Sequence, residues 1–412
     1  MRIGLVSNTF PPIPGGMEAY LDHLSAALNG EGHTVRVVTR FTQERPTPFS
    51  ALLASSEPPS VTDHRGVTVQ VMAPSGLRRL LLRPVYRLHH RRATQPLAIQ
   101  LMHAALGPAL RKALRGCEVV HFSGCGREML GFVAARIARE MGVPFVVTPH
   151  MHIGTWGDGA FDFSLYRQAD ALIALTTHER RFCIKQGLAP DIVHVCGHGI
   201  PNEQPGIGER YRSESGLGDA PMVLFLGRKS AYKGYTRLLD AAPVIWAQHP
   251  DATFVFAGPG DDSVTLSAEQ EQVLGDPRVS SYGFVSDQMR DDLFAAADLF
   301  CLPSTDEAFG LVYVEAGAYG TPVVAHDIPT LRELIGTAGT GVLTEQTAED
   351  VARGCIELLS DPEKRHTLGG RNQELALRRT WSNVAADMAT LYAKCAGRQI
   401  KKNVPVPTVM PA

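Results

Sequence analysis

The segment EAFGLVYVE places two carboxylates, Glu307 and Glu315, at the ends of a short apolar run. Paired carboxylates act as the acid and nucleophile of glycoside hydrolases, ligate metal ions, or accept hydrogen bonds from the hydroxyl groups of a sugar. They also occur as ordinary charges at the ends of a buried helix. The other groups that the chain brings to the same place decide between these interpretations.

Two cations follow the apolar stretch MVLFLG, in the segment RKSAYKG. Arg228 and Lys233 stand five positions apart beside a glycine, a spacing that suits a diphosphate. The guanidinium can fork onto the phosphate oxygens while the ammonium supplies a point charge. The pair indicates a phosphorylated ligand.

The stretch LFCLPSTDEAFGLVYVEAGAYGTPVVA predicts a strand over 299–303, a loop with Glu307, and a helix that begins near Gly310 and contains Glu315. The amides of Phe309, Gly310 and Leu311 at the start of this helix suit an anion. A nucleotide sugar explains the carboxylates and the cations together. A retaining hydrolase needs two carboxylates roughly 5 Å apart across one bond and no diphosphate site.

Two further turns in the first half carry candidate residues. Gly15 and Gly16 open a helix after the first strand, without GxGxxG or P-loop spacing. His150 and His152 follow the strand PFVVT, and no nearby cysteine or carboxylate pair completes a metal-ligand set. We expect His150, at the strand end, to contact substrate, with a structural role as the alternative.

Apolar strands alternate with helices along the whole chain. The predicted strands are 3–8, 35–40, 67–73, 118–124, 144–150, 171–176, 191–197, 222–227, 253–258, 278–283, 299–304, 322–325 and 340–344. Near-continuous apolar strands of this kind form doubly wound parallel sheets, which bind ligands beyond the carboxyl ends of their strands. We therefore expect an α/β protein of two Rossmann-like domains that face a central cleft.

The domain boundaries follow from composition. We expect an N-terminal, acceptor-binding domain over 1–200 and a polar, glycine-bearing linker over 201–221. A nucleotide-sugar-binding domain then spans 222–380, a helix over 381–396 packs back on the first domain, and the Pro-rich tail 397–412 is disordered.

Bulk composition describes a globular protein of 412 residues with a net charge of −2. No apolar run is long enough to span a membrane. The seven cysteines are scattered singly, which favours a reduced, cytoplasmic protein without disulfides or a zinc site.

The charge is uneven. Residues 1–205 carry 21 Lys and Arg against 15 Asp and Glu, and residues 206–412 carry 19 against 27. Residues 64–117 contain no acid, and leucines interleave with their arginines. Such a segment is a solvated basic face or binds an anionic membrane surface. Nucleic acid is disfavoured, because no nucleic-acid motif accompanies the charge.

The motifs together resemble the family-4 retaining glycosyltransferases of the GT-B fold. The resemblance is strongest over 222–336, in GRKSAYKG, SSYGFVSD and EAFGLVYVE, which matches the E-x7-E motif of the family. PPIPGG and VVTPH match the loops of its N-terminal domain less specifically. His198 and Pro201, in CGHGIPNE, depart from the Asn and Asp that family members often carry there.

The resemblance implies roles for individual residues. Catalysis would rest on His150 near the donor sugar, Arg228 and Lys233 on the leaving diphosphate, and Glu307 on sugar hydroxyls. The donor-binding residues would be Gly16 by the diphosphate, Phe309, Gly310 and Leu311 through their amides, Glu315 on the ribose diol, and Val285 and Asp287 near the base. No metal or other cofactor is implied.

The sequence thus predicts a retaining, metal-independent glycosyltransferase. Its donor is a nucleotide sugar, with a UDP-sugar preferred and GDP-mannose next, and its acceptor is a hydroxyl group, including that of a lipid-linked glycan precursor. By resemblance, peripheral attachment to the inner face of the plasma membrane is a further expectation. The rivals are a nucleotide-sugar epimerase, a nicotinamide-dependent dehydrogenase and a non-catalytic membrane-binding protein.

Overall fold

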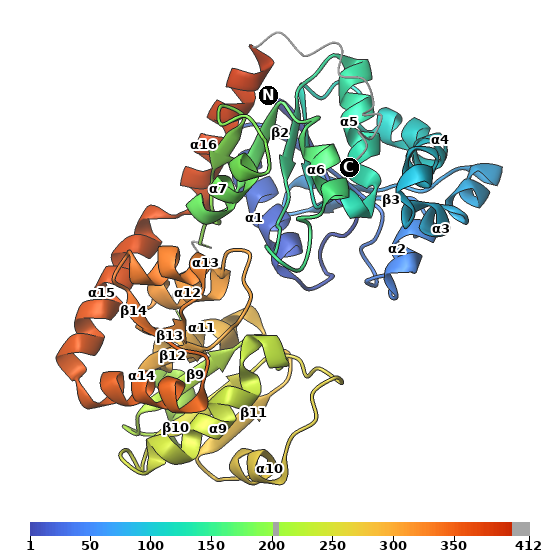
Figure 1. Ribbon diagram of the computed structural model, residues 1–412. Coiled ribbons are helices and arrows are strands. Elements are labelled where there is room, and N and C mark those ends of the chain that lie inside the picture. Colours follow the sequence, from blue (N-terminus) through green and yellow to red (C-terminus); the bar gives the residue numbers. More distant parts are fainter. Residues whose placement is uncertain (201–205, 398–412) are drawn as a thin grey trace. The chain divides into compact units, whose positions relative to one another are not determined.

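The computed structural model describes residues 1–200 and 206–397, and the chain divides into two compact units (Figure 1). Unit 1 comprises residues 1–199 together with the described residues from Trp381 onward, and unit 2 comprises residues 200–380. Both units are parallel-sheet α/β structures, which confirms the predicted fold class.

Unit 1 is built on an eight-stranded sheet with the order β3-β4-β2-β1-β5-β6-β7-β8. Its strands are β1 Arg2–Val6, β2 Thr34–Thr39, β3 Ser60–His64, β4 Val67–Val71, β5 Val119–Ser123, β6 Phe145–Thr148, β7 Ala171–Ala174 and β8 Val193–Val195. Its helices are α1 Gly16–Gly30, α2 Phe49–Ala54, α3 Val85–His89, α4 Gln95–Ala113, α5 Leu130–Met141, α6 Ala160–Tyr166, α7 Thr177–Lys185 and α16 Trp381–Ala396, with 3₁₀ turns at Gly76–Leu82, Arg92–Thr94 and Gly126–Glu128.

All strands of this sheet are parallel except β3, which pairs antiparallel with β4. Strand β3 was not predicted from the sequence. The strand lies at the edge of the sheet and its residues SVTDH are mostly exposed, so it carries no apolar run. Arg65 and Gly66 form the turn between β3 and β4 with φ values of 55° and 77°, the left-handed pair that a two-residue hairpin loop requires.

Helix α16 belongs to unit 1 although it follows the whole of unit 2 in the chain. It packs against α1, and its apolar stripe is buried there. The buried residues of that stripe are Trp381, Val384, Ala385, Met388, Tyr392 and Cys395.

Unit 2 contains a six-stranded parallel sheet with the order β11-β10-β9-β12-β13-β14. Its strands are β9 Met222–Leu226, β10 Thr253–Ala257, β11 Val279–Tyr282, β12 Leu299–Leu302, β13 Val323–His326 and β14 Gly341–Thr344. Its helices are α8 Gly208–Glu214, α9 Tyr235–Trp246, α10 Ala268–Leu274, α11 Asp287–Ala296, α12 Leu311–Ala318, α13 Pro329–Leu331, α14 Ala348–Ser360 and α15 Pro362–Arg378, with a 3₁₀ turn at Ala231–Lys233 and a π turn at Arg332–Gly336.

Residues 201–221 were expected to form a linker, but the described part of this segment contains a helix. Helix α8 lies within it and packs against α11. Arg210 pairs with Asp292 at 3.5 Å, and Arg212 pairs with Asp298 at 2.8 Å. These tertiary ion pairs stabilise a helix whose sequence, GERYRSE, has no apolar stripe. Residues 201–205 of the expected linker and 398–412 of the expected tail lie outside the described residues.

Candidate functional site

The strand order of unit 2 determines where its functional loops meet. Strand β9 is central, with β10 on one side and β12 on the other. Because the chain moves from β9 toward one edge and then returns to β12, the carboxyl ends of β9 and β12 form a topological switch point, where open α/β sheets bind ligands. The loops that follow these two strands contain Lys233 and Glu307.

These two residues form an ion pair. Lys233 Nζ lies 2.6 Å from Glu307 Oε1, and the side chains are 17% and 7% exposed. Burial alone would lower the pKa of Lys233, but the Glu307 carboxylate outweighs it and holds this pKa above its usual value. Lys233 is therefore a stable cation at the switch point, with two further N–H donors available to a ligand.

Backbone contacts fix the distance between the two loops. Thr305 N–H donates to the carbonyl oxygen of Tyr232 at 2.8 Å. Gly234, with φ at 75°, lies so close that an added Cβ would stand 2.3 Å from the carbonyl oxygen of Pro303. Only glycine fits this position, because both the backbone conformation and the neighbouring chain exclude a side chain.

The start of α12 completes this end of the sheet. Gly310 precedes the helix with φ at 88°, so the N–H groups of the first turn begin directly after the loop that holds Glu307. Phe309 is 3% exposed, and Arg379 lies over its ring at 5.6 Å. The ring is thus part of the support of the loop rather than an exposed platform.

Arg290 of α11 was not predicted from the sequence, but it lies near two residues that were, Asp287 and Glu315. Its guanidinium pairs with Asp287 and Asp291, each at 2.9 Å. Burial lowers the pKa of Arg290, but the nearby charge of Glu315, and then of the aspartates, raises it above its usual value. Asp287 and Glu315 therefore approach a common cation. The DxxRD spacing in α11 could have indicated the pairing with the aspartates, but not the approach of Glu315.

Two further predicted residues, Arg228 and Val285, lie outside the ion pairs of Lys233 and Arg290. Arg228 is exposed directly after β9, and its charge contributes, after hydrogen bonds from Ser263, to a lowered pKa of Asp261. Val285 is half-buried in the loop after β11. Both lie at the carboxyl end of the sheet, as do Lys233 and Glu307.

Gly16 and His150 belong to unit 1, whereas the other predicted residues belong to unit 2. Gly16 begins α1 after β1, and a Cβ added to it would meet nothing within 4 Å. His150 follows β6 with φ at 50°, and its Nε2 forms a hydrogen bond of 2.7 Å with Ser123 Oγ. The ring of Tyr20 in α1 lies 4.8 Å from that of His150, so the helix that begins at Gly16 also contacts the histidine.

Neither a metal-ligating cluster nor a membrane-spanning helix is present in the part of the chain that the structure describes. Over 1–200 and 206–397, no group of three or more His, Cys, Asp or Glu side chains is placed to hold a metal ion. Within the same ranges, no helix combines the length and the hydropathy that a membrane crossing requires.

Two family models match the chain. A glycosyl transferase 4-like domain covers residues 15–199, and the glycosyl transferases group 1 model covers residues 208–375. The chain belongs to the group 1 glycosyltransferases. The two matches together span most of its length, and they confirm the resemblance that the sequence motifs indicated.

Relatives of this glycosyltransferase match it nearly end to end. An uncharacterized glycosyltransferase of Methanocaldococcus jannaschii is 25% identical over 95% of this chain and 98% of its own length. The glycogen synthase of Mycobacterium tuberculosis is 28% identical over 98% of both chains. The phosphatidyl-myo-inositol mannosyltransferase of the same organism is 27% identical over 98% of this chain and 100% of its own.

Solved structures establish the fold of the glycosyltransferase as GT-B. Sucrose-phosphate synthase of Thermosynechococcus elongatus superposes with a TM-score of 0.71 at 22% identity, over 95% of this chain and 98% of its own. The HepE protein of Anabaena, in complex with UDP-glucose, superposes with a TM-score of 0.72 at 20% identity, over 96% of this chain and 100% of its own.

Proposed function

We propose that this glycosyltransferase transfers a sugar from a nucleoside-diphosphate donor to a hydroxyl acceptor, with retention at the anomeric carbon and without a metal ion. A UDP-sugar is the first choice of donor and GDP-mannose the second. The observation that carries the proposal is the Lys233–Glu307 ion pair at the switch point of unit 2. The UDP-glucose complex of the Anabaena neighbour supports the choice of UDP.

Each group at the carboxyl end of unit 2 has a task in this reaction. Lys233 neutralises the diphosphate as the glycosidic bond to it breaks, while Glu307, still hydrogen-bonded to Lys233, accepts a hydrogen bond from a sugar hydroxyl. The first amides of α12 bind phosphate oxygen, and Glu315 accepts from the ribose diol. In unit 1, His150 contacts the donor sugar. The acceptor oxygen forms the new glycosidic bond and its proton passes to the leaving diphosphate oxygen. Catalysis then consists of positioning and charge stabilisation, without a dedicated protein base.

Calorimetric titration with UDP, GDP, ADP and NAD in the presence of EDTA tests the proposal. We expect one nucleoside diphosphate to bind selectively without metal, and to raise the free energy of unfolding by about 2.7 kcal/mol at a hundred times its dissociation constant. Exchange of Lys233 for alanine should weaken this binding, because the ammonium faces the diphosphate. Binding of NAD alone, or of none of the four, would contradict the proposed donor class.

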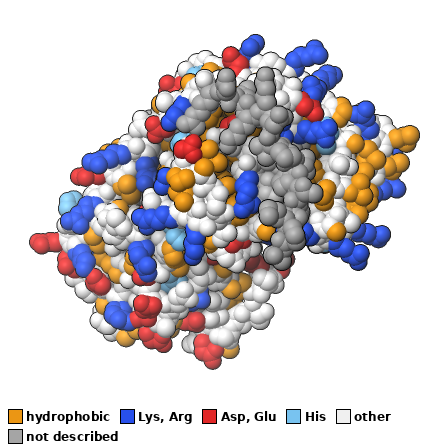
Figure 2. Space-filling model, turned by 45° about the horizontal axis from the view of Figure 1, so that its top comes forward, with side chains coloured by type: hydrophobic (Ala, Val, Ile, Leu, Met, Phe, Trp, Pro, Cys, Tyr) orange, Lys and Arg blue, Asp and Glu red, His pale blue; other side chains and the backbone are white. Residues whose placement is uncertain are grey.

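We further propose a membrane-associated acceptor, on the basis of the surface of residues 64–117. Leu77, Leu80 and Leu97 are 80%, 40% and 47% exposed there. The arginines at 78, 79, 83, 87 and 91 are exposed beside them. Figure 2 shows hydrophobic and basic side chains close together on the part of unit 1 where Figure 1 labels α3 and α4. Not every apolar residue of this segment is exposed beside the arginines, because Leu82 and Val85 lie in the core of unit 1.

Sedimentation with lipid vesicles tests this surface. We expect the protein to sediment with vesicles that contain phosphatidylglycerol and not with vesicles of phosphatidylcholine alone, since each basic residue near an anionic surface contributes about 1 kcal/mol. Leu77→Ser with Arg78→Gln and Arg79→Gln should abolish binding at 0.15 M salt. The matched control, Arg353→Gln with Arg378→Gln, removes exposed charge from unit 2 and should bind as the wild type does. Equal binding of both variants would contradict the assignment.

A further inference from the structure

A buried group of rings surrounds His150 in unit 1. Tyr20 of α1 lies at its centre, with its ring 4.8 Å from His150, 4.9 Å from His198 and 5.6 Å from Trp381. The rings of His150 and His198 are 6.0 Å apart and perpendicular. Tyr20 is fully buried, and His198 and Trp381 are 5% and 6% exposed. Ring pairs in this distance range attract one another beyond the effect of their buried area, so the group resists displacement.

The backbone at His150 needs such support. Its φ of 50° is in the left-handed region, which a residue other than glycine occupies only when its surroundings impose it. Ser123 holds the imidazole from one side. Glu179 of α7 accepts hydrogen bonds from the N–H groups of Met151 and Leu175, which fixes the residue directly after His150. The Ser123 hydrogen bond, the anchored backbone that follows the histidine and two ring contacts thus determine the orientation of the imidazole.

The same surroundings set the charge of His150. Burial, and after it the neighbouring histidines His198, His121 and His152, hold its pKa well below the ordinary range. No carboxylate contributes to that shift, and burial likewise raises the pKa of the adjacent Tyr20. The imidazole is therefore neutral at physiological pH, and the Tyr20 ring is part of the burial that keeps it neutral.

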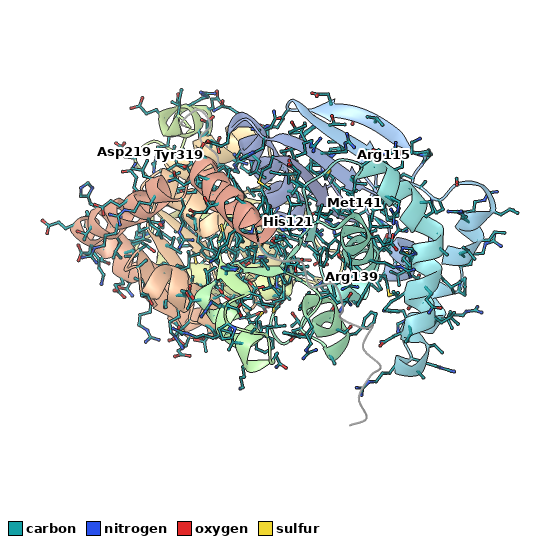
Figure 3. The ribbon with its side chains drawn as sticks, turned by 90° about the horizontal axis from the view of Figure 1, so that it is seen from above. Arg115, His121, Arg139, Met141, Asp219 and Tyr319 are labelled. Carbon is teal, nitrogen blue, oxygen red and sulfur yellow. The ribbon has the colours of Figure 1, made fainter. Side chains whose placement is uncertain are left out.

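Helix α16 contacts this group at two points. Trp381, its first residue, packs on Tyr20 and stacks with His23 at 5.5 Å. Tyr392 Oη lies 2.7 Å from His121 Nδ1, and His121 Nε2 lies 2.8 Å from Thr148 Oγ1, at the end of the strand that leads to His150. Figure 3 labels His121 beside this helix. The last helix of the chain therefore stabilises both Tyr20 and the base of the His150 loop.

We infer that Tyr20 is a positioning residue for His150: its ring, backed by His198 and Trp381, fixes the half-buried imidazole in one orientation and shields it from water on that side. The inference rests on the proposed function, in which His150 contacts the donor sugar.

Exchange of Tyr20 tests the inference. Tyr20→Leu keeps most of the apolar volume but removes the ring, and we expect kcat to fall about ten- to a hundredfold, as misplacement of a substrate-contacting group does. Affinity for UDP, or for GDP if the titration selects it, should not change, because His150 acts on the sugar. Tyr20→Phe restores the ring and should restore kcat. His198→Asn, a smaller change, should lower kcat in the same direction but less.

The matched control is Phe254→Leu, which removes a fully buried ring from unit 2, where Phe254 packs against Trp246. It should cost comparable stability without lowering kcat. An equal loss of kcat in Phe254→Leu, or in Tyr20→Phe, would overturn the inference, because the effect would then follow stability or the hydroxyl rather than the ring.

A readout independent of activity separates this inference from the proposed function. In protein with 13C-labelled histidine rings, the His150 signal, assigned by its loss in His150→Gln, should not titrate near pH 6.5 in the wild type. In Tyr20→Leu it should titrate there, because water reaches the ring. Unchanged His150 signals in Tyr20→Leu would overturn the inference. Full activity of His150→Gln, by contrast, would contradict the proposed contact with the donor and leave the ring measurement valid.

Discussion

Lys233→Ala is expected to lower kcat/KM for the nucleotide-sugar donor by about 10²–10³-fold, the usual effect of removing one group that stabilises charge in the transition state. The ammonium lies at the switch point of unit 2, where charge develops on the leaving diphosphate in the proposed reaction. Glu307→Ala is expected to lose most activity as well. Steady-state kinetics with the selected donor measure both losses.

The double variant, Lys233→Ala with Glu307→Ala, should distinguish the effect of the ion pair on stability from its effect on activity. Each single exchange leaves one charge with little solvent and no partner, which is strongly destabilising, whereas removal of both avoids the unpaired charge. We therefore expect the double variant to regain stability in urea unfolding but no activity. Arg212→Ala is the control for the loss of an ion pair outside the candidate site, because it breaks the Arg212–Asp298 pair beside the amino end of β12. Wild-type turnover in both single variants would contradict the site.

Gly234→Ala is expected to lose both activity and stability. Alanine at a φ of 75° costs about 1–2 kcal/mol, and a Cβ 2.3 Å from the Pro303 carbonyl oxygen adds an overpacking cost of about 1–3 kcal/mol. Relief of that contact moves the loop of Lys233 away from the loop of Glu307, so transfer activity should fall even where the protein remains folded.

Gly216→Ala provides the comparison for this variant. Gly216 has a φ of 70°, also in unit 2, but a Cβ there meets nothing within 4 Å. It therefore tests the backbone cost alone, by urea unfolding and by kinetics. Equal loss of stability in the two variants would show that the contact with Pro303 contributes nothing, and unchanged activity in Gly234→Ala would show that the spacing of the two loops is not critical.

The architecture could be predicted from the sequence because the central strands of parallel sheets are buried on both faces and appear as apolar runs. The exceptions have physical causes. Strand β3 is an exposed edge strand, and α8 is a polar helix that forms through ion pairs with residues about 80 positions away. Local patterns contain no information about such partners.

The candidate site could be predicted residue by residue but not as an arrangement. The types of Lys233 and Glu307, and their places after apolar strands, indicated a donor site. Their direct pairing across 74 positions depends on the neighbourhood of β9 and β12, which only the fold establishes. Arg290 between Asp287 and Glu315, and Trp381 beside Tyr20, likewise result from tertiary packing.

The return of α16 to unit 1 has a consequence for the order in which the protein is made. Unit 2 is one uninterrupted segment, so its core can close as soon as that segment has been synthesised. Unit 1 lacks the partner of α1 until all of unit 2 has followed, and the hydrogen bond between His121 and Tyr392 joins residues 271 positions apart. Contacts of such long range form late, and the apolar surface of α1 stays exposed in the nascent chain meanwhile. The N-terminal unit, begun first, is therefore the last to be completed.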